Sequence, residues 1–200
     1  MVRISVKNFL DGSYLIYSDN ITSAGKWAKE VDRCPEGSFA NGFQVKTEKF
    51  QSPFVDDTAM NGLRLFCSDS DASVTSNEGV WGDWKNTYKC DNEGQIKGFQ
   101  LRSEDGGQVD NTAANNIKMI CTSGETHEGD GLQFGSYRGI HVCADNFVVC
   151  GIKTQIEPDQ GPMSKYKNDI KLIPTKSMLK RWLVLRHCAE YVCLNDRCKF

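Results

Sequence analysis

The chain has 200 residues, of which 39% are hydrophobic and 25% are charged, a composition typical of a folded globular protein rather than a disordered one. No segment approaches the roughly 20 uncharged apolar residues of a transmembrane helix. The formal net charge of −2 argues against a general binder of nucleic acid or of anionic membranes. Residues 170–200 differ from the rest of the chain, because they hold seven Lys or Arg and only two acidic residues.

Cysteine usage indicates an oxidising compartment. Nine cysteines in 200 residues are dense for a reducing cytosol, and an odd number leaves at least one thiol free or bonded to another chain. The sequon Asn20-Ile21-Thr22 makes Asn20 a candidate for glycosylation. Residues 1–10 lack the apolar run of a secretory signal peptide. We therefore expect a secreted, extracellular protein whose signal peptide is absent from this sequence.

One sequence unit occurs three times, over about residues 14–69, 70–124 and 125–174. Its marker is a glycine with a Cys eight residues before it and a Glu six residues after it. The segments from Gly to Glu read GFQVKTE, GFQLRSE and GIKTQIE, and their glycines are 56 and then 53 residues apart. The markers are Cys34, Gly42 and Glu48; Cys90, Gly98 and Glu104; Cys143, Gly151 and Glu157. Two spacings that are the same in all three copies indicate an internal repeat.

Each unit predicts β-strands. Apolar and polar side chains alternate over residues 43–48 and 99–104, the pattern of a half-buried strand, and second strands begin near residues 63 and 117. We expect the glycine before each first strand to supply a turn with positive φ or a bulge, and Asn41-Gly42 is the strongest turn signal. A unit of this size cannot bury its apolar face alone, so residues 1–174 are predicted to form one domain of three sheets around a shared core.

The repeat also predicts disulfides. Cys34 with Cys67, and Cys90 with Cys121, would each close a loop of about 30 residues, which stabilises a fold by about 3–4 kcal/mol in the loop-entropy model. In the third unit Pro174 replaces the second cysteine. The candidate partners of Cys143 are therefore Cys150 or a cysteine of the C-terminal tail, which contains Cys188, Cys193 and Cys198.

The joined pattern resembles the vitelline membrane outer layer protein I family over about residues 14–174. Its most specific parts are Asp56–Cys67, which reads DDTAMNGLRLFC, and Val80–Cys90, which reads VWGDWKNTYKC. The resemblance implies an all-β fold, a β-prism of three Greek-key sheets around a pseudo-threefold axis. It also implies a secreted component of an extracellular coat, and a role with sugars such as chito-oligosaccharides. The third unit lacks the DDTA segment, and the tail of residues 175–200 has no counterpart in the family pattern.

Two kinds of side chain are candidates for glycan contacts. Carboxylates accept hydrogen bonds from sugar hydroxyls, and a gathered pair is what glycoside hydrolysis requires. Aromatic rings stack on the C–H faces of sugars. The candidates are Glu48, Asp56, Asp57, Glu104, Asp110 and Glu157, with Trp27, Trp81 and Trp84. The same residues suit turns and a β core, and recurrence at equivalent positions of a repeat favours these structural roles over catalysis.

No cofactor or metal site is predicted. The tail cysteines are five residues apart, unlike the ligands of structural zinc, and the chain has no phosphate-binding loop, dinucleotide fingerprint or nucleophile elbow. The sequence favours a non-enzymatic structural component of an extracellular coat or matrix that contacts glycans or glycoproteins. The odd cysteine offers a disulfide to a partner chain. One alternative is a soluble lectin-like protein, or a weak glycosidase or transglycosylase acting on chito-oligosaccharides.

The basic, Cys-rich tail of residues 175–200 suggests a second alternative, a defence or venom component that acts on membranes. Its apolar residues have the spacing of one face of an amphipathic helix: Met178, Leu179, Trp182, Leu183 and Leu185. Such a segment packs on the acidic body of the protein, on a partner or on a membrane surface, and we favour packing on the body.

Overall fold

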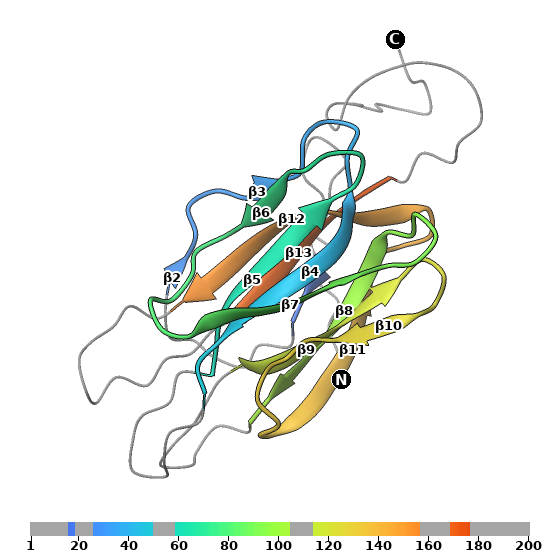
Figure 1. Ribbon diagram of the computed structural model, residues 1–200. Helices are drawn as coiled ribbons and strands as arrows, with labels where there is room; N and C mark the ends of the chain where they lie inside the picture. Colours follow the sequence, from blue (N-terminus) through green and yellow to red (C-terminus); the bar gives the residue numbers. More distant parts are fainter. Residues whose placement is uncertain (1–15, 19–25, 50–58, 105–113, 157–168, 177–200) are drawn as a thin grey trace, which may run out of the picture.

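The computed structural model describes residues 16–18, 26–49, 59–104, 114–156 and 169–176. These residues form β-strands and connecting turns, with no helix among them, so no helix of the described chain is long and apolar enough to cross a membrane. The strands are arranged in three antiparallel sheets (Figure 1). The all-β prediction is therefore confirmed, whereas the helical tail predicted after Thr175 lies almost wholly outside the described residues.

The first and second sheets share one topology. Sheet 1 has the order β6-β5-β4-β7, from β4 (Ala40–Thr47), β5 (Met60–Cys67), β6 (Ser73–Thr75) and β7 (Asp83–Lys89). Sheet 2 has the order β10-β9-β8-β11, from β8 (Ile96–Ser103), β9 (Ala114–Cys121), β10 (Thr126–Glu128) and β11 (Ser136–Val142). In each, the fourth strand returns to lie beside the first, which is the Greek-key arrangement.

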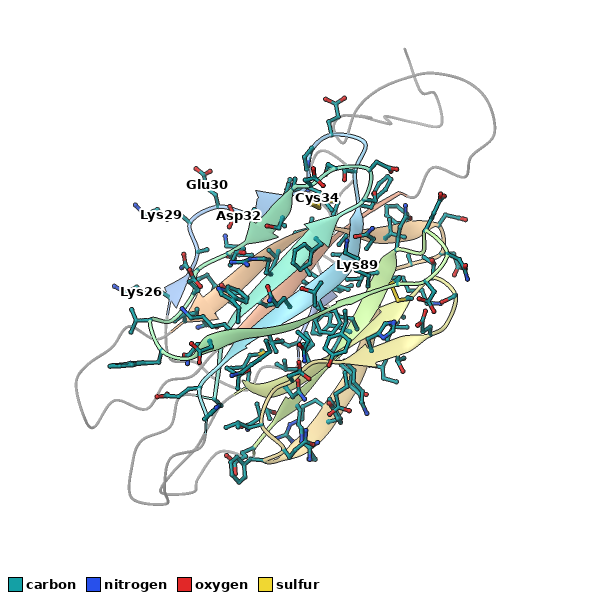
Figure 2. The ribbon with its side chains drawn as sticks, in the orientation of Figure 1. Lys26, Lys29, Glu30, Asp32, Cys34 and Lys89 are labelled. Carbon is teal, nitrogen blue, oxygen red and sulfur yellow. A yellow bond between two sulfur atoms is a disulfide. The ribbon has the colours of Figure 1, made fainter. Side chains whose placement is uncertain are left out.

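Sheet 3 combines the two ends of the described chain. Its long strands are β12 (Phe147–Ile156) and β13 (Asp169–Lys176). The outer strands are β1 (Ile16–Tyr17), which pairs with β13, and β2 (Lys26–Trp27) and β3 (Asp32–Arg33), which both pair with β12. The side chains of the β2–β3 segment that Figure 2 labels, such as Lys26, Lys29 and Glu30, project away from the sheets into solvent. The first unit of the sequence thus completes the sheet of the last.

The sheets do not coincide with the sequence units. Each sheet takes its two long strands from one unit and its edge strands from the start of the next, because β6 and β7 flank β5 and β4, and β10 and β11 flank β9 and β8. The register is the same in each case: Trp84 lies opposite Lys46, Tyr137 opposite Arg102, and Trp27 opposite Gln155. The boundaries near residues 70 and 125 therefore fall inside sheets rather than between them.

The repeated glycines lie inside long strands, so the predicted turn at Asn41-Gly42 is wrong. The bulge is correct: the pairing register shifts between Ala40 and Gly42, between Ile96 and Gly98, and between Val149 and Gly151. None of these glycines has positive φ. A Cβ atom there would meet the neighbouring edge strand, for example 2.6 Å from the His141 carbonyl oxygen at Gly98, so glycine is needed for close approach of two strands.

The inward faces of the sheets share one core. Strict alternation along the long strands buries Phe43, Val45, Leu63 and Leu65 of sheet 1. They pack in one cluster with side chains from the other two sheets: Phe99, Leu101, Ile117, Met119, Val149, Ile152 and Leu172. A smaller cluster of Phe39, Val148, Cys150 and Ile173 lies outside this core. The shared core is what the repeat predicts for units that cannot bury their own faces.

Two disulfides join neighbouring sheets. Cys34 follows β3 at the edge of sheet 3 and bonds to Cys67 of sheet 1, and Cys90 follows β7 of sheet 1 and bonds to Cys121 of sheet 2. These are the pairs that the spacing predicts. In sheets 1 and 2 the second cysteine lies opposite the residue two positions before the repeated glycine: Cys67 opposite Ala40, and Cys121 opposite Ile96. In sheet 3 the residue at this register is Pro174, opposite Val149. The join between sheets 2 and 3 therefore has no disulfide at this position.

Cys143 and Cys150 do not form the disulfide that was one of the alternatives. Cys143 belongs to the inner core, where burial raises the pKa of its thiol to about 12. Cys150 belongs to the outer cluster on the other face of β12, with its Sγ 3.6 Å from Nη1 of Arg33. The two side chains therefore lie on opposite faces of sheet 3. The tail cysteines, which are the other alternative, lie outside the described residues.

Candidate functional site

The structure describes some of the candidate residues and not others. Glu48, Glu104, Trp27, Trp81 and Trp84 are described. The remaining candidates, Asn20, Asp56, Asp57, Asp110 and Glu157, lie outside the described residues. The candidate site therefore consists of the described glutamates and aromatic residues and their neighbours.

Two aromatic rings are displayed at the start of an edge strand. Trp81 precedes β7 and is 48% exposed, and Phe134 precedes β11 and is 39% exposed. Each is followed by a glycine with positive φ, Gly82 at 81° and Gly135 at 70°. These glycines allow the chain to turn sharply between the loop that carries the ring and the strand that follows.

Each displayed ring lies in the loop next to one repeated glutamate. A Cβ atom on Gly82 would lie 2.5 Å from the amide nitrogen of Glu48, and a Cβ atom on Gly135 would lie 2.6 Å from the amide nitrogen of Glu104. The backbone of the glutamate therefore packs directly against the residue after the ring. In two sheets, and in the same register, the loop that carries the ring of Trp81 or Phe134 packs against the backbone of the repeated glutamate, Glu48 or Glu104.

A cation holds each ring-bearing loop. The Lys46 ammonium donates to the carbonyl oxygen of Gly79 at 2.9 Å and lies 3.4 Å from the Glu78 carboxylate. The Arg102 guanidinium donates to the carbonyl oxygen of Phe134 at 3.2 Å and to Oε1 of Gln133 at 2.7 Å. Both cations occupy one repeat position, two residues before the glutamate. They fix the loops, and so the rings, in place.

Strand aromatics have a different role from the loop aromatics. Trp84 is half-buried, its ring packs over Gly62, and the Arg64 guanidinium lies 4.0 Å from the ring centroid. At the equivalent position of sheet 2, Lys118 lies 4.0 Å from the ring of Tyr137. The contacts of Trp84 are those of a residue that packs a sheet. Trp27 has the same register in sheet 3, opposite Gln155.

Charges on the outer face of sheet 2 are coupled. Burial and the neighbouring Glu128 carboxylate raise the pKa of Tyr137. Burial also acts to raise the pKa of Glu128, but Tyr137 and the charge of Lys118 outweigh it, so that this pKa lies below its usual value. Glu128 Oε2 is 3.5 Å from the Lys118 ammonium. The carboxylate stays ionised at neutral pH and stabilises the sheet.

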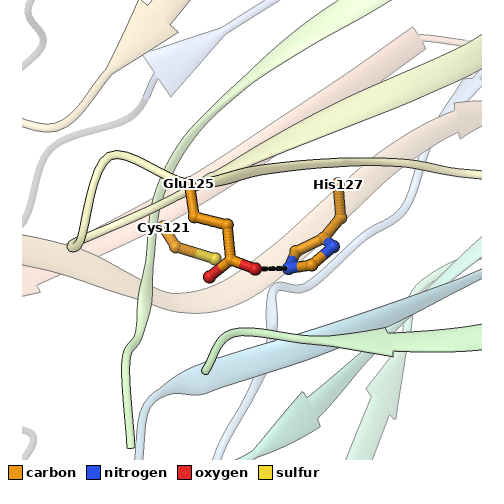
Figure 3. Close-up of side chains that lie close together, drawn as sticks. All are labelled: Cys121, Glu125 and His127. Atoms are coloured by element: carbon orange, nitrogen blue, oxygen red, sulfur yellow. Dashed lines mark ion pairs between the residues drawn. The ribbon is translucent and has the colours of Figure 1, made fainter. Parts of the chain in front are cut away.

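One cluster among the described residues has the residue types of a metal site. Cys121, Glu125 and His127 approach one another at the join of sheets 1 and 2, and His127 Nε2 is 2.7 Å from Glu125 Oε1 (Figure 3). Metal binding requires a cysteine thiolate, whereas the Cys121 sulfur is bonded to Cys90. The cluster does not fit a metal ion.

The sequence alone did not distinguish the aromatic residues of the loops from those of the strands. It also did not identify Lys46 and Arg102 as the residues that hold the loops. The signal for the cations was present, because Lys46 and Arg102 occupy one repeat position in GFQVKTE and GFQLRSE. Their partners lie about 30 residues away in the chain, and only the sheet register brings them together. The sequence also shows that Ala24-Gly25 aligns with Trp81-Gly82, so the first unit, whose opening strands form edges of sheet 3, carries no ring at this position.

Comparison with known proteins identifies related sequences. A model of the vitelline membrane outer layer protein I family matches residues 14–173. The vitelline membrane outer layer protein 1 homolog of Homo sapiens is 36% identical over 150 residues, which are 70% of this chain and 73% of that protein. The homolog of Mus musculus is 36% identical over 151 residues, 71% of this chain and 74% of that protein.

The fold is shared with solved lectin structures at low sequence identity. Calystegia sepium agglutinin superposes with a TM-score of 0.53 at 12% identity, covering 78% of this chain and 92% of that one. A jacalin-related, mannose-binding lectin from Ananas comosus superposes with a TM-score of 0.51 at 10% identity, covering 84% of this chain and 99% of that one. These similarities support the β-prism architecture.

Proposed function

Starting from the premise that this chain belongs to the vitelline membrane outer layer protein I family, we propose that it is a secreted, glycan-binding structural component of an extracellular coat. The observation that carries the proposal is an exposed ring, Trp81 or Phe134, in a loop that packs against the backbone of a repeated glutamate, Glu48 or Glu104. The names of the relatives refer to the outer layer of a vitelline membrane, which supports an extracellular coat as the location. The two inter-sheet disulfides suit an oxidising compartment.

The chemistry of the pair suits a sugar. An exposed ring stacks on the C–H face of a pyranose, while a carboxylate beside it accepts hydrogen bonds from the hydroxyls at the rim. Lys46 and Arg102 hold the loops before a ligand arrives, which reduces the entropy lost on binding. A solved relative in fold, the Calsepa lectin, forms a complex with a biantennary N-glycan, and its TM-score is 0.52 at 12% identity. This supports glycan binding by a prism of this kind.

Binding without hydrolysis suits the repeat better than catalysis. Glycoside hydrolysis requires two carboxylates in unlike environments, one protonated and one ionised. Glu48 and Glu104 instead have equivalent positions, each at the end of its own sheet and each beside its own ring loop. The arrangement gives two similar binding sites, which favours attachment to a polymer with repeated sugars through avidity.

A glycan array with the oxidised full chain tests the proposal. Trp81→Ala and Phe134→Ala are each expected to weaken binding by about tenfold, because a stacked ring contributes about 1–1.5 kcal/mol. Trp81→Phe keeps a ring and should retain most of the affinity. Val80→Ala is the matched control, since Val80 is exposed in the same loop but has no ring.

Three results would contradict the proposal. A flat array from correctly oxidised protein would remove glycan binding and leave the coat role to protein contacts. Unchanged binding by the double variant of Trp81 and Phe134 would place the sugar elsewhere. Cleavage of chito-oligosaccharides that is lost in Glu48→Gln would show catalysis.

A further inference from the structure

On the outer face of sheet 1, a lysine side chain lies opposite the repeated glycine. Lys89, at the end of β7 (Figure 2), lies across Gly42. Its ammonium is 5.8 Å from the ring centroid of Phe66 on the next strand. The long side chain therefore shields an apolar residue that would otherwise face water, while its charge stays in solvent.

Sheet 3 is covered at the same position in a similar way. Arg33 lies opposite Gly151, with its Cγ 3.1 Å from where a Cβ of that glycine would be. Ile173 on the next strand is fully buried in the outer cluster, beneath Phe39 and Val31. In sheets 1 and 3 a cation thus lies across the repeated glycine, beside the half-buried Phe66 in sheet 1 and the buried Ile173 in sheet 3.

Sheet 2 lacks this shielding. Val142 stands where the other sheets have Lys89 and Arg33, and it lies across Gly98 from the partly exposed Ile120. Ile140 stands where β7 has Thr87. Val142 is 48% exposed and Ile140 is 63% exposed. We call Ile120, Ile140 and Val142 the sheet-2 patch; it is an apolar surface at the position where the other sheets are shielded.

The turns beside the sheet-2 patch are acidic. Three turns lie at this end of sheet 2, after β7, β9 and β11. Thr122 N, after β9, donates to the carbonyl oxygen of Gln95 in the turn after β7, and Cys143 N, after β11, donates to the carbonyl oxygen of Lys97 in β8. The three turns carry Asp91, Glu93, Glu125 and Asp145, and Lys97 lies nearby in β8. An apolar surface with acidic turns at its edge suits an apolar segment that carries positive charge.

The described chain ends close to this surface. Lys176 pairs with Phe147, and the Phe147 amide donates to the carbonyl oxygen of Ala144, two residues after Val142. Twenty-four residues follow, with five Lys or Arg and two acidic residues. Five apolar residues at helical spacing lie at the start of this segment, from Met178 to Leu185, among Lys180, Arg181 and Arg186.

We infer that residues 177–200 dock on the sheet-2 patch, with their apolar side chains over Ile120, Ile140 and Val142 and their cations toward the acidic turns. The segment takes the place of the cation that shields the other two sheets. Its length, its starting point and its charge all match this surface. The docking is intramolecular and does not depend on glycan binding.

Hydrogen–deuterium exchange of the oxidised full chain tests the docking. Amides of residues 177–200 should exchange at least about tenfold more slowly than in an unfolded peptide. The double variant Ile140→Thr, Val142→Lys installs the residues that β7 has at these positions, and it should remove most of that protection. Val80→Lys adds the same charge at a valine that is 71% exposed on a different loop, and it should leave the protection unchanged.

Several results would overturn the inference. Fast exchange of residues 177–200 in the unchanged protein would show that they do not dock, and full protection in the double variant would place them on another surface. Protection that grows with protein concentration would identify a second copy as the occupant. Equal exchange in β8 and β9 of all variants shows that the fold is intact. If the double variant unfolds, Val142→Thr provides the same test with a smaller change.

Discussion

The hydroxyl of Tyr88 donates a hydrogen bond of 2.6 Å to Oδ1 of Asp130, which joins the edge strand of sheet 1 to the loop after β10 of sheet 2. The backbone amide of Asn86 donates to the other carboxylate oxygen at 3.0 Å. The ring of Tyr88 also stacks between Phe43 and His127, with centroid distances of 5.7 and 6.2 Å. This one side chain therefore links the core to the join between two sheets.

Tyr88→Phe should destabilise the protein by about 1–2 kcal/mol, because a hydrogen bond to a charged group is lost while the ring is kept. Urea unfolding at neutral pH measures the change. The hydrogen bond to Asp130 and burial raise the pKa of Tyr88, so its stabilising effect is present below pH 10 and declines as the pH rises through the folded pKa. The two proteins should therefore converge in alkaline solution. Equal stability at neutral pH would show that the link contributes nothing.

Gly98→Ala should destabilise the fold by about 1–3 kcal/mol, because its Cβ would lie 2.6 Å from the His141 carbonyl oxygen and force β8 and β11 apart. Gly124→Ala is the matched control. Gly124 has a φ of 91° but no atom within 4 Å of a Cβ, so this change carries only the cost of backbone strain, about 1 kcal/mol. Thermal unfolding of the two variants compares the stability lost when two strands are forced apart with the stability lost when alanine takes a positive φ. A smaller loss in Gly98→Ala than in Gly124→Ala would contradict the role assigned to the repeated glycine.

Pro174→Cys should restore the missing third disulfide, because position 174 has the register of Cys67 and Cys121, and Cys143 has the backbone contact of Cys34 and Cys90. The bond forms during oxidative folding with oxidised glutathione, before burial protects the Cys143 thiol. A loop of about 31 residues gives about 3–4 kcal/mol of stabilisation.

Peptide mapping of the oxidised Pro174→Cys variant identifies the linkage, and its melting temperature reports the gain. The variant that also carries Cys143→Ser cannot form the bond and is the control. A map without a peptide that links Cys143 to position 174 would show that the third join does not follow the other two.

Glu128→Gln should lower stability at neutral pH by up to about 1 kcal/mol, a small value because the ion pair with Lys118 is about one-third exposed. The folded pKa of Glu128 lies below 4.5, so its contribution is present above that value and is lost as the pH falls through the folded pKa. Unfolding curves from pH 7 to pH 3 should therefore converge. A double-mutant cycle with Lys118→Met isolates the pair, and a coupling that persists at pH 3 would contradict an ionic origin.

The alternation of apolar and polar residues in the sequence predicts the long strands and the residues of the core. Alternation around Phe43 and Phe99 places the long strands and the core, because one face of each strand must be buried. The same patterns fail at Asn41-Gly42, where a turn signal lies inside β4. Gly42 is needed there because β7, about 45 residues further along the chain, lies too close for a side chain at this position. Rules that consider only neighbouring residues in the sequence cannot predict that contact.

The candidate site shows the same division. The repeat identifies Glu48 and Glu104 and the aromatic residues near them. It does not show that Trp81 is displayed by a loop while Trp84 packs under Arg64, since both lie in one short run of sequence. Strand register also decides that Lys46 and Arg102 hold the ring loops. The sequence-predicted role of Asp56, Asp57, Asp110 and Glu157 stays a prediction.

The offset between sequence units and sheets makes this domain a closed ring of three. A unit supplies two long strands to one sheet and the edge strands to the sheet before it, so a single unit makes no complete sheet. Only when the opening residues β1, β2 and β3 reach β12 and β13 does the last sheet gain its edges. A chain with one unit removed would have to close over a narrower circle, and its interior would be too small for side chains the size of Phe43 and Phe99. The number of units and the size of the core therefore fix each other.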